Sequence, residues 1–557
     1  MVSGSFARTG FYYLQFAFLL SDDPAAAHIE KRPVNGRVAE AHTFQLAKQW
    51  VEDCHVNHTR CAEVKRSFQP SRVLDVGSEA DSHIRLVETK AYPSTDFTKF
   101  VALSYCWGGD QAVKSTKATL ASRLAGVSFI DLPITLQDSV TVCRKLAIQY
   151  LWIDCLCIIQ DDPDDLIREL ATMGRVYRES YLTLKASSAS RSQDGFLEDR
   201  NSQKDENLGI QARFVCQDGS IGSVILLRED KMVPPWPMQP LDSRGWALQE
   251  HELSPRILEY GIHQARWLCQ TVDLFDGGLH RSAGKAEEVS IKGGYLAASI
   301  YEDTIWSSVV QDYCNRALSF DTDKLPAVAA IAEEYYKNII YDDRGNRITQ
   351  KYLAGLWLFS LSSLLLWTRS GEATRPTDYR APSWSWAALN SKISFDNCSI
   401  EEATELEILE AETTPASDKL PFGAVTSGHV KLKSRMLRSP WKFTIQEVES
   451  SAIPSDAIGG QLRIWLDAPN EDFGNTFDSS QLWFFEATCS LRCERQRGLI
   501  LVEFGNSTYR RVGAFSINHH QPDSLDIDTL RKLSVGKHSD HCQGCFAQAQ
   551  THIITVI

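Results

Sequence analysis

Residues 100–108 read FVALSYCWG, residues 132–138 read LPITLQD, and residues 150–162 read YLWIDCLCIIQDD. The first segment is a short apolar run closed by Trp-Gly-Gly, which is typical of a buried strand that ends in a turn. The third is almost continuously apolar from Tyr150 to Ile159 and predicts a strand covered on both faces. The middle segment predicts a helix over 135–147, because Thr135 and Asp138 form an N-terminal capping signature. That helix has one apolar face, formed by Leu136, Val140, Cys143 and Ala147.

A second helix and a third strand follow directly. The helix is predicted over 164–178, after Pro163, and its apolar residues share a narrow arc: Leu166, Leu170, Met173 and Tyr177. Residues 181–186 read YLTLKA and alternate like a strand. Two successive strand–helix–strand units favour a parallel sheet with right-handed crossovers. We therefore expect adjacent, parallel strands at 100–105, 150–158 and 181–186, in an α/β core with flanking helices.

The ends of these strands are where a ligand is expected. In parallel sheets, ligands bind beyond the carboxyl ends of the strands. Here those ends carry a group of polar and aromatic candidates for ligand binding: Ser104, Cys106, Trp107, Gln160, Asp161 and Ser187. Cys106 is discounted as a nucleophile, because a thiol needs a base such as histidine and the core stretch contains none.

Several segments resemble the heterokaryon-incompatibility (HET) domain of filamentous fungi. The resemblance rests on SYCWG at 104–108, LPxTxxD at 132–138, LWIDxLCIxQDD at 151–162 and MxxVY at 173–177. It continues with RGWALQE at 244–250, LSPR at 253–256 and APSWSWA at 381–387, so it covers most of the chain. One departure is His251, where the family often has arginine.

The resemblance implies a fungal, cytoplasmic protein of nonself recognition, whose HET domain acts as an effector of programmed cell death. The order of elements also looks like that of the TIR domain, a flavodoxin-like fold, and certain TIR domains hydrolyse NAD. Two other classes stay open: a signalling module that works by protein partners or self-association, and a tailoring protein of a fungal metabolite pathway that binds a small molecule.

Hydrolysis of the nicotinamide–ribose bond would need a fixed carboxylate near the ribose. The catalytic candidates are Glu169 at the edge of the second helix, Glu198 after the third strand, and Asp154. Solvated surface charge is the plainer explanation for the two glutamates. Asp154 is predicted to lie inside a strand, where it can instead satisfy backbone or arginine donors.

Residues 243–258 contain a second group of candidates. Arg244, Gln249 and Glu250 are either a buried ion pair that holds this segment on the core or contacts to a ligand. Trp246 is expected to be largely buried if the segment docks on the core.

Composition narrows the class of protein. The net charge of −13 argues against a nucleic-acid partner. The chain lacks the common nucleotide and hydrolase motifs, so no cofactor is expected. Fourteen cysteines in 557 residues are too sparse for a disulfide scaffold and indicate a reducing compartment. No apolar run is long enough to span a membrane.

The length predicts several domains. We expect a poorly ordered leader at 1–40, a helix and strands at 41–98, the HET domain at 99–270, a helical region at 271–395 and a β-rich domain at 396–557. Residues 209–228 predict a hairpin with Asp218-Gly219 as its turn, and residues 352–367 predict a buried helix.

Two clusters have metal-competent side chains. Cys54, His58 and Cys61 recur at helical spacing, but a structural zinc site needs four ligands and no fourth is evident nearby. The second cluster is His538, His541, Cys542 and Cys545, whose spacing favours an incidental loop. Helix packing is the preferred explanation of the first cluster, and no metal is expected.

Overall fold

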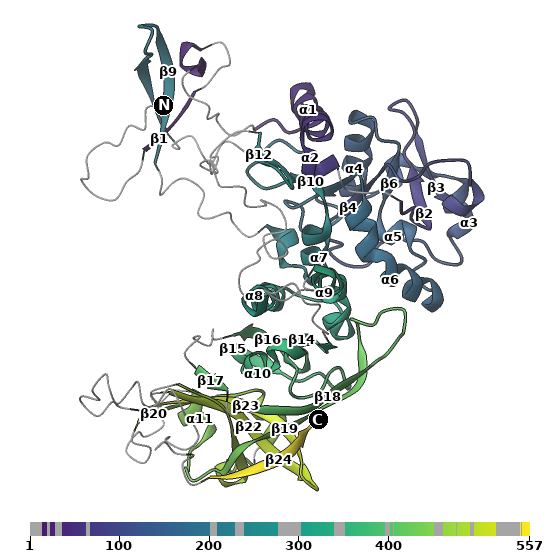
Figure 1. Ribbon diagram of the computed structural model, residues 1–557. Coiled ribbons are helices and arrows are strands. Elements are labelled where there is room, and N and C mark those ends of the chain that lie inside the picture. The colour runs from purple at the N-terminus through teal and green to yellow at the C-terminus, as the bar shows by residue number, and fades with distance from the viewer. Residues whose placement is uncertain are drawn as a thin grey trace. The chain divides into compact units, whose positions relative to one another are not determined.

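The computed structural model (Figure 1) describes residues 14–18, 23–27, 36–62, 67–200, 209–228, 239–276, 302–338, 351–395, 402–404, 406–449, 460–474, 476–490, 495–519, 546 and 549–557. The chain divides into two units, Met1–Ala297 and Ala298–Ile557, and each is described by itself. The second metal-competent cluster, His538 to Cys545, lies outside the described residues, as does most of the leader at 1–40.

A nine-stranded mixed sheet forms the centre of the first unit, in the order β12-β11-β10-β7-β4-β6-β2-β3-β5. The strands are β2 (Arg72–Asp75), β3 (His83–Glu88), β4 (Phe100–Ser104), β5 (Val127–Ser128), β6 (Tyr150–Trp152), β7 (Leu182–Lys185), β10 (Arg256–Tyr260), β11 (Ala265–Cys269) and β12 (Asp273–Phe275). β4 pairs in parallel with both β6 and β7, which confirms the predicted arrangement of the three strands. β10 extends the parallel part next to β7, whereas β2, β3, β11 and β12 add antiparallel flanks. The sheet is therefore mixed rather than all-parallel, because hairpins extend it on both sides.

The two predicted crossover helices are confirmed. α4 (Ile134–Lys145) connects β4 to β6, and α6 (Pro163–Glu179) connects β6 to β7 (Figure 1). α6 buries Met173 and Tyr177, and also the acidic residues Asp165, Glu169 and Glu179. The buried face of this helix is thus more polar than its leucines indicated.

The predicted strand from Tyr150 to Ile159 is wrong beyond Trp152. β6 ends there, and Asp154–Cys157 form a short helix, α5. A continuous apolar run does not distinguish a buried strand from a buried helical turn. The turn is fixed by Arg72, which donates to the carbonyl of Cys157 at 2.6 Å and binds Asp165 through both terminal nitrogens, at 2.6 and 3.0 Å.

The predicted capping role of Thr135 and Asp138 is also wrong. α4 begins after Pro133 without a side-chain cap. Asp138 Oδ2 instead accepts hydrogen bonds from the backbone N–H groups of Phe196 (2.7 Å) and Leu197 (3.1 Å). Thr135 accepts one from the N–H of Gly195 at 3.2 Å. Both side chains therefore hold the loop that follows β7.

The hairpin at 209–228 and the segments before the large sheet form regular structure, of which the strand at 14–18 was not predicted. The predicted hairpin is confirmed as β8 (Gly209–Val215) and β9 (Ile221–Arg228). β1 (Leu14–Phe18), inside the expected leader, pairs antiparallel with β9. Farther along, α1 (Ala41–Asn57) and α2 (Thr59–Ala62) precede the large sheet.

The second unit begins with α8 (Glu302–Cys314) and α9 (Pro326–Asn338). The predicted buried helix at 352–367 is wrong: this segment forms β13 (Tyr352–Leu353), β14 (Leu356–Trp357) and the short α10 (Leu361–Leu364). Ala354 and Gly355 both have positive φ, which a helix does not allow. A Cβ at Gly355 would stand 2.7 Å from the ring of Trp386, so the turn is fixed by tertiary packing. β15 (Thr368–Thr374) and β16 (Asn390–Ser394) follow as an antiparallel pair.

The predicted β-rich C-terminal region is confirmed. Its strands are β17 (Glu402–Thr404), β18 (Glu407–Pro415), β19 (Val425–Arg438), β20 (Gly460–Leu466), β21 (Leu482–Ser490), β22 (Arg495–Gly505), β23 (Thr508–His519) and β24 (Gln550–Val556). β19 pairs with both β24 and β21, which closes β21, β22, β23, β24 and β19 into a ring.

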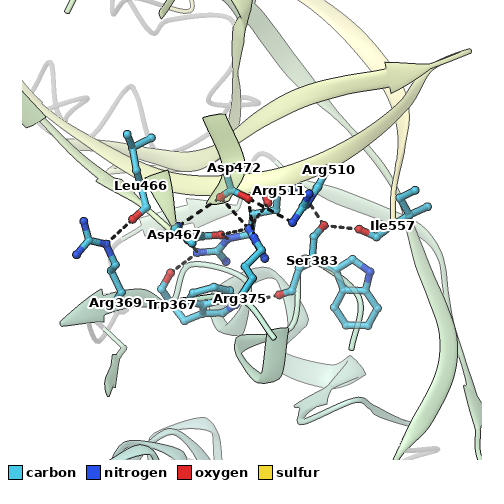
Figure 2. A network of polar contacts seen from close by, with 12 residues as sticks. Trp367, Arg369, Arg375, Ser383, Leu466, Asp467, Asp472, Arg510, Arg511 and Ile557 are labelled. Carbon is cyan, nitrogen blue, oxygen red and sulfur yellow. Dashed lines mark hydrogen bonds and ion pairs between the residues drawn. The ribbon is translucent and has the colours of Figure 1, made fainter. Parts of the chain in front are cut away.

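A buried polar network joins the tryptophan-rich segment to these strands (Figure 2). Arg511 is fully buried and donates to the carbonyls of Leu365 (2.6 Å) and Trp367 (2.5 Å). Its guanidinium also pairs with Asp467 at 3.2 Å. Trp384 and Trp386 are fully buried, and Trp386 lies in a short 3-10 helix.

Candidate functional site

The carboxyl end of β4 meets α5 and α7 (Gly245–Leu253) in a cluster of polar side chains. We call Ser104, Trp107, Asp154, Arg244 and Glu250 the strand-end cluster. Trp107 Nε1 donates to Asp154 Oδ2 at 2.8 Å, which links the turn after β4 to the start of α5. Ser104 Oγ hydrogen-bonds Glu250, and Arg244 donates to the carbonyl of Tyr105.

Arg244 interacts electrostatically with two carboxylates of the cluster, those of Glu250 and Asp154. Burial raises the pKa of Glu250, while Arg244 and the hydrogen bond from Ser104 oppose that rise. Burial likewise raises the pKa of Asp154, against the influence of Arg244 and Trp107. Glu250 is 2% exposed, whereas Asp154 and Trp107 keep partial contact with solvent. As a residue, Asp154 is therefore less completely buried than Glu250.

Cys106 belongs to the packing beneath this cluster. Its side chain is buried against Leu241 and Ala247. Burial raises the pKa of the Cys106 thiol to about 11, so the thiol stays neutral at physiological pH. This agrees with discounting Cys106 as a nucleophile.

A second polar group, which we call the Lys185 cluster, lies at the ends of β7 and β10. The buried Lys185 ammonium stands 3.4 Å from both Glu259 and Asp242. Ser187 Oγ donates to Glu259 at 2.6 Å, and Arg266 lies 3.6 Å from the same carboxylate. Burial alone would raise the pKa of Glu259, but Lys185 and Arg266 together lower it.

Of the remaining predicted residues, Gln160 contacts the backbone of the strand-end cluster, whereas Asp161 and Glu198 have no described contact with it. Gln160 donates to the carbonyls of Asp154 (3.2 Å) and Ile158 (3.1 Å), and the exposed Asp161 accepts from Lys117 N at 2.7 Å. Glu198 is exposed, as its surface-charge explanation expected.

The other candidates differ in burial. Glu169 is 2% exposed on α6, and its Oε1 stands 3.5 Å from Arg168 Nε, so it is not a solvated surface charge. Gln249 is buried on α7. Trp246 keeps partial contact with solvent, and its neighbours Ala247 and Leu248 are in the core.

Sequence reasoning missed Lys185 and Glu259 as site residues. Lys185 is a charged residue inside a predicted strand, Glu259 lies in a short apolar segment, and a buried charge needs a partner. That signal was present in YLTLKA and in ILEY at 257–260. It does not identify the partner, because the two strands come together only in the folded sheet.

The side chains that could hold a metal lie elsewhere. Cys54, His58, Cys61 and Cys269 are all buried, and their ligand atoms lie within 4.8 Å of one another. The structure thus supplies the fourth ligand that the sequence did not indicate. An exposed group on the second unit, Glu410, Glu412 and His429, also satisfies this distance. Among the described residues, no helix is long and apolar enough to cross a membrane.

These features belong to an α/β domain whose polar residues gather at the ends of parallel strands. Residues 100–250 match the family model of the heterokaryon incompatibility protein (HET). The chain therefore contains a HET domain over this range, which begins at β4 and ends within α7. The comparison with curated proteins and the comparison with solved structures found no match.

Proposed function

We propose that the chain is an effector of heterokaryon incompatibility in a filamentous fungus, which takes part in nonself recognition and starts programmed cell death. The match of residues 100–250 to the HET family carries this proposal. Nonself recognition requires that the chain responds to a protein partner or to its own self-association. The domain outside the matched range then transmits or receives that signal.

The strand-end cluster is the proposed functional centre. Ser104, Asp154 and Glu250 come from the beginning, the middle and the end of the matched range. Taking ions out of water costs several kcal/mol each, and well-packed apolar residues often replace a buried ion pair without loss of stability. A fold that keeps Glu250 buried beside Arg244 therefore supports a role for the cluster beyond packing.

A second candidate is hydrolysis of the bond between nicotinamide and ribose in NAD. One observation favours it: Asp154 is partly exposed and is held by the partly exposed Trp107. A fixed carboxylate stabilises the oxocarbenium character that develops when nicotinamide leaves with the bonding electron pair. Water then adds to the ribose carbon and releases a proton. The indole face offers a surface for a planar ring.

Inducible expression in a filamentous fungus tests the first proposal. We expect growth arrest and cell death with the parent chain. Glu250→Gln and Asp154→Asn should abolish killing at equal protein level, because each removes one charge from the cluster. Glu198→Gln is the matched control, since Glu198 is an exposed carboxylate in the same domain, and it should kill like the parent. Survival of cells that express the parent chain would contradict the proposed function.

An assay of NAD hydrolysis with purified protein distinguishes the two candidate functions. If NAD hydrolysis is the activity, the parent chain and Glu198→Gln release nicotinamide from NAD, and Asp154→Asn does not. Normal killing with a constant NAD level would exclude hydrolysis and leave the effector proposal intact. Killing by folded Glu250→Gln and Asp154→Asn variants would instead move the functional centre away from the strand-end cluster.

A further inference from the structure

Four metal-competent side chains from distant parts of the chain meet in the first unit. Cys54 lies in the last turn of α1, His58 is the residue that follows α1, and Cys61 lies in α2. Cys269 is the last residue of β11. His58 is 9% exposed and the three cysteines are fully buried. None of the four lies in the matched range of 100–250.

The geometry fits one tetrahedral ion. The ligand atoms of Cys54, His58, Cys61 and Cys269 all lie within 4.8 Å of one another, and His58 Nδ1 stands 3.4 Å from Cys269 Sγ. With metal–ligand bonds of 2.0–2.3 Å, the donor atoms of a tetrahedral zinc centre are separated by about 3.3–3.8 Å. Three cysteines and one histidine are one of the usual ligand sets of structural zinc.

The groups around the four ligands are those that a metal–thiolate centre requires. The backbone N–H groups of Thr271 and Val272 each donate to Cys269 Sγ at 3.4 Å. On the other side of the His58 ring, Nε2 stands 3.4 Å from the carboxylate of Asp53. A carboxylate in that position fixes the tautomer of a ligating histidine and raises its basicity.

Arg256 supplies an independent observation. It is 1% exposed, yet its described polar contacts are Cys54 Sγ at 3.3 Å and the carbonyl of Cys61 at 2.5 Å, and neither is a carboxylate. Among the described residues, its Nη1 has no hydrogen-bond partner. A buried cation needs a compensating negative charge. Three thiolates around one divalent ion carry a net charge of −1, which this arginine neutralises.

We propose that Cys54, His58, Cys61 and Cys269 bind one structural zinc ion. The thiolate and imidazole donors favour zinc over the hard cations magnesium and calcium, and four protein ligands leave no open position for catalysis. The ion joins α1 and α2 to β11, which lie on opposite sides of the HET domain in sequence. It therefore fastens the two flanks of that domain into one folded unit, across a separation of 211 residues between His58 and Cys269.

Metal content is the first measurement. The 557-residue chain, purified from zinc-supplemented cells without chelator, should contain about one zinc ion per chain by mass spectrometry of the metal. Exchange with cobalt should give the visible absorption of tetrahedral, thiolate-bound Co²⁺. Parent chain that is free of zinc and takes up no cobalt would overturn the proposal. So would a disulfide between two of the three cysteines in freshly purified chain.

Variants locate the site. Cys269→Ser should lose the zinc, whereas Cys143→Ala should keep it, because Cys143 is a buried cysteine of α4 outside the cluster. His58→Cys should also keep zinc, since four cysteines form a structural site as well. Zinc retained by both Cys269→Ser and Cys61→Ser would place the ion elsewhere and refute the assignment.

Asp53→Asn tests ligation by His58 without a change to a buried residue. Asp53 is 55% exposed, so Asp53→Asn should fold like the parent chain. Loss of a carboxylate that orients a ligating histidine weakens metal affinity by about 10–100-fold. We expect that decrease in competition with a chelator, and a neighbouring exposed variant, Glu52→Gln, should bind like the parent. Equal affinity in Asp53→Asn and the parent would contradict ligation by His58.

Discussion

The indole Nε1 of Trp107 donates a 2.8 Å hydrogen bond to Oδ2 of Asp154, 47 positions farther along the chain. The bond connects the turn after β4 to the first residue of α5. It also keeps the Asp154 carboxylate in a fixed position, beside an arginine that two acidic groups share. We therefore expect the contributions of Trp107 and Asp154 to stability to be coupled.

A double-mutant cycle tests this coupling. Trp107→Phe keeps the aromatic packing and removes the donor, while Asp154→Asn removes the charge. Because hydrogen bonds to charged groups contribute about 1.5–3 kcal/mol, we expect Trp107→Phe to lower the free energy of unfolding by that amount. The same change should have little effect when Asn already replaces Asp154. Urea unfolding, followed in the first unit by pulse-labelling hydrogen exchange, measures both values, and additive effects would contradict the coupling.

The stability contributed by Glu250 should fall as the pH rises. Its pKa in the folded chain is raised above the ordinary value of 4.5, mainly by burial. A raised pKa means that the contribution is fully present below about pH 4.5 and is lost as the pH rises through the folded-state pKa. The stability advantage of the parent over Glu250→Gln should therefore shrink as the pH rises above about 4.5. A pH-independent difference in urea midpoint would show that the pKa of Glu250 is not raised.

Glu259 should show the opposite dependence on pH. Although burial opposes it, Lys185 and Arg266 lower the pKa of Glu259 below 4.5. Its contribution is then present above about pH 4.5 and is lost as the pH falls through the folded-state pKa. The advantage of the parent over Glu259→Gln should decrease under acidic conditions in the same unfolding measurement. Since Glu250 and Glu259 are both buried glutamates of one unit, each variant serves as the control for the other.

In the second unit, Arg511 and Arg510 are adjacent in sequence but differ in environment (Figure 2). Arg511 is fully buried, its guanidinium lies 3.4 Å from the ring centroid of Trp367, and burial lowers its pKa to about 10. Arg511→Met leaves Asp467 without its close partner and should cost about 3–5 kcal/mol. Arg510 is 40% exposed and lies 3.3 Å from Asp472, so Arg510→Met should cost less than about 1 kcal/mol.

Native-state hydrogen exchange of β20 and β23 measures the loss of unfolding free energy locally in both variants. This measurement does not require the two units of the chain to unfold in a single transition. Equal protection of these strands in the Arg511→Met and Arg510→Met variants would contradict the importance of the buried network.

The strand order around β4 illustrates what local patterns determine. The apolar strands at 100–105 and 181–186, separated by amphipathic helices, predicted a parallel arrangement, and the pairing of β4 with β6 and β7 confirms it. Handedness and crossover length leave few alternatives for such units, so pattern alone is enough. The HET domain at 100–250 could also be predicted, because SYCWG, LWID and RGWALQE are contiguous segments of the chain.

Features that depend on contacts between distant segments of the chain could not be predicted from the sequence. Cys269 completes the metal-competent cluster only because β11 pairs with β10, which brings it to α1 and α2. Likewise, Lys185 and Glu259 become partners through the parallel pairing of β7 with β10. The segments 150–159 and 352–367 are almost continuously apolar. Their hydrophobic pattern therefore shows neither the period of a helix nor that of a strand, and it does not distinguish the two. At Gly355, packing against Trp386 determines the turn. The local sequence determines which faces of an element are apolar, but only the tertiary structure determines which residues those faces contact.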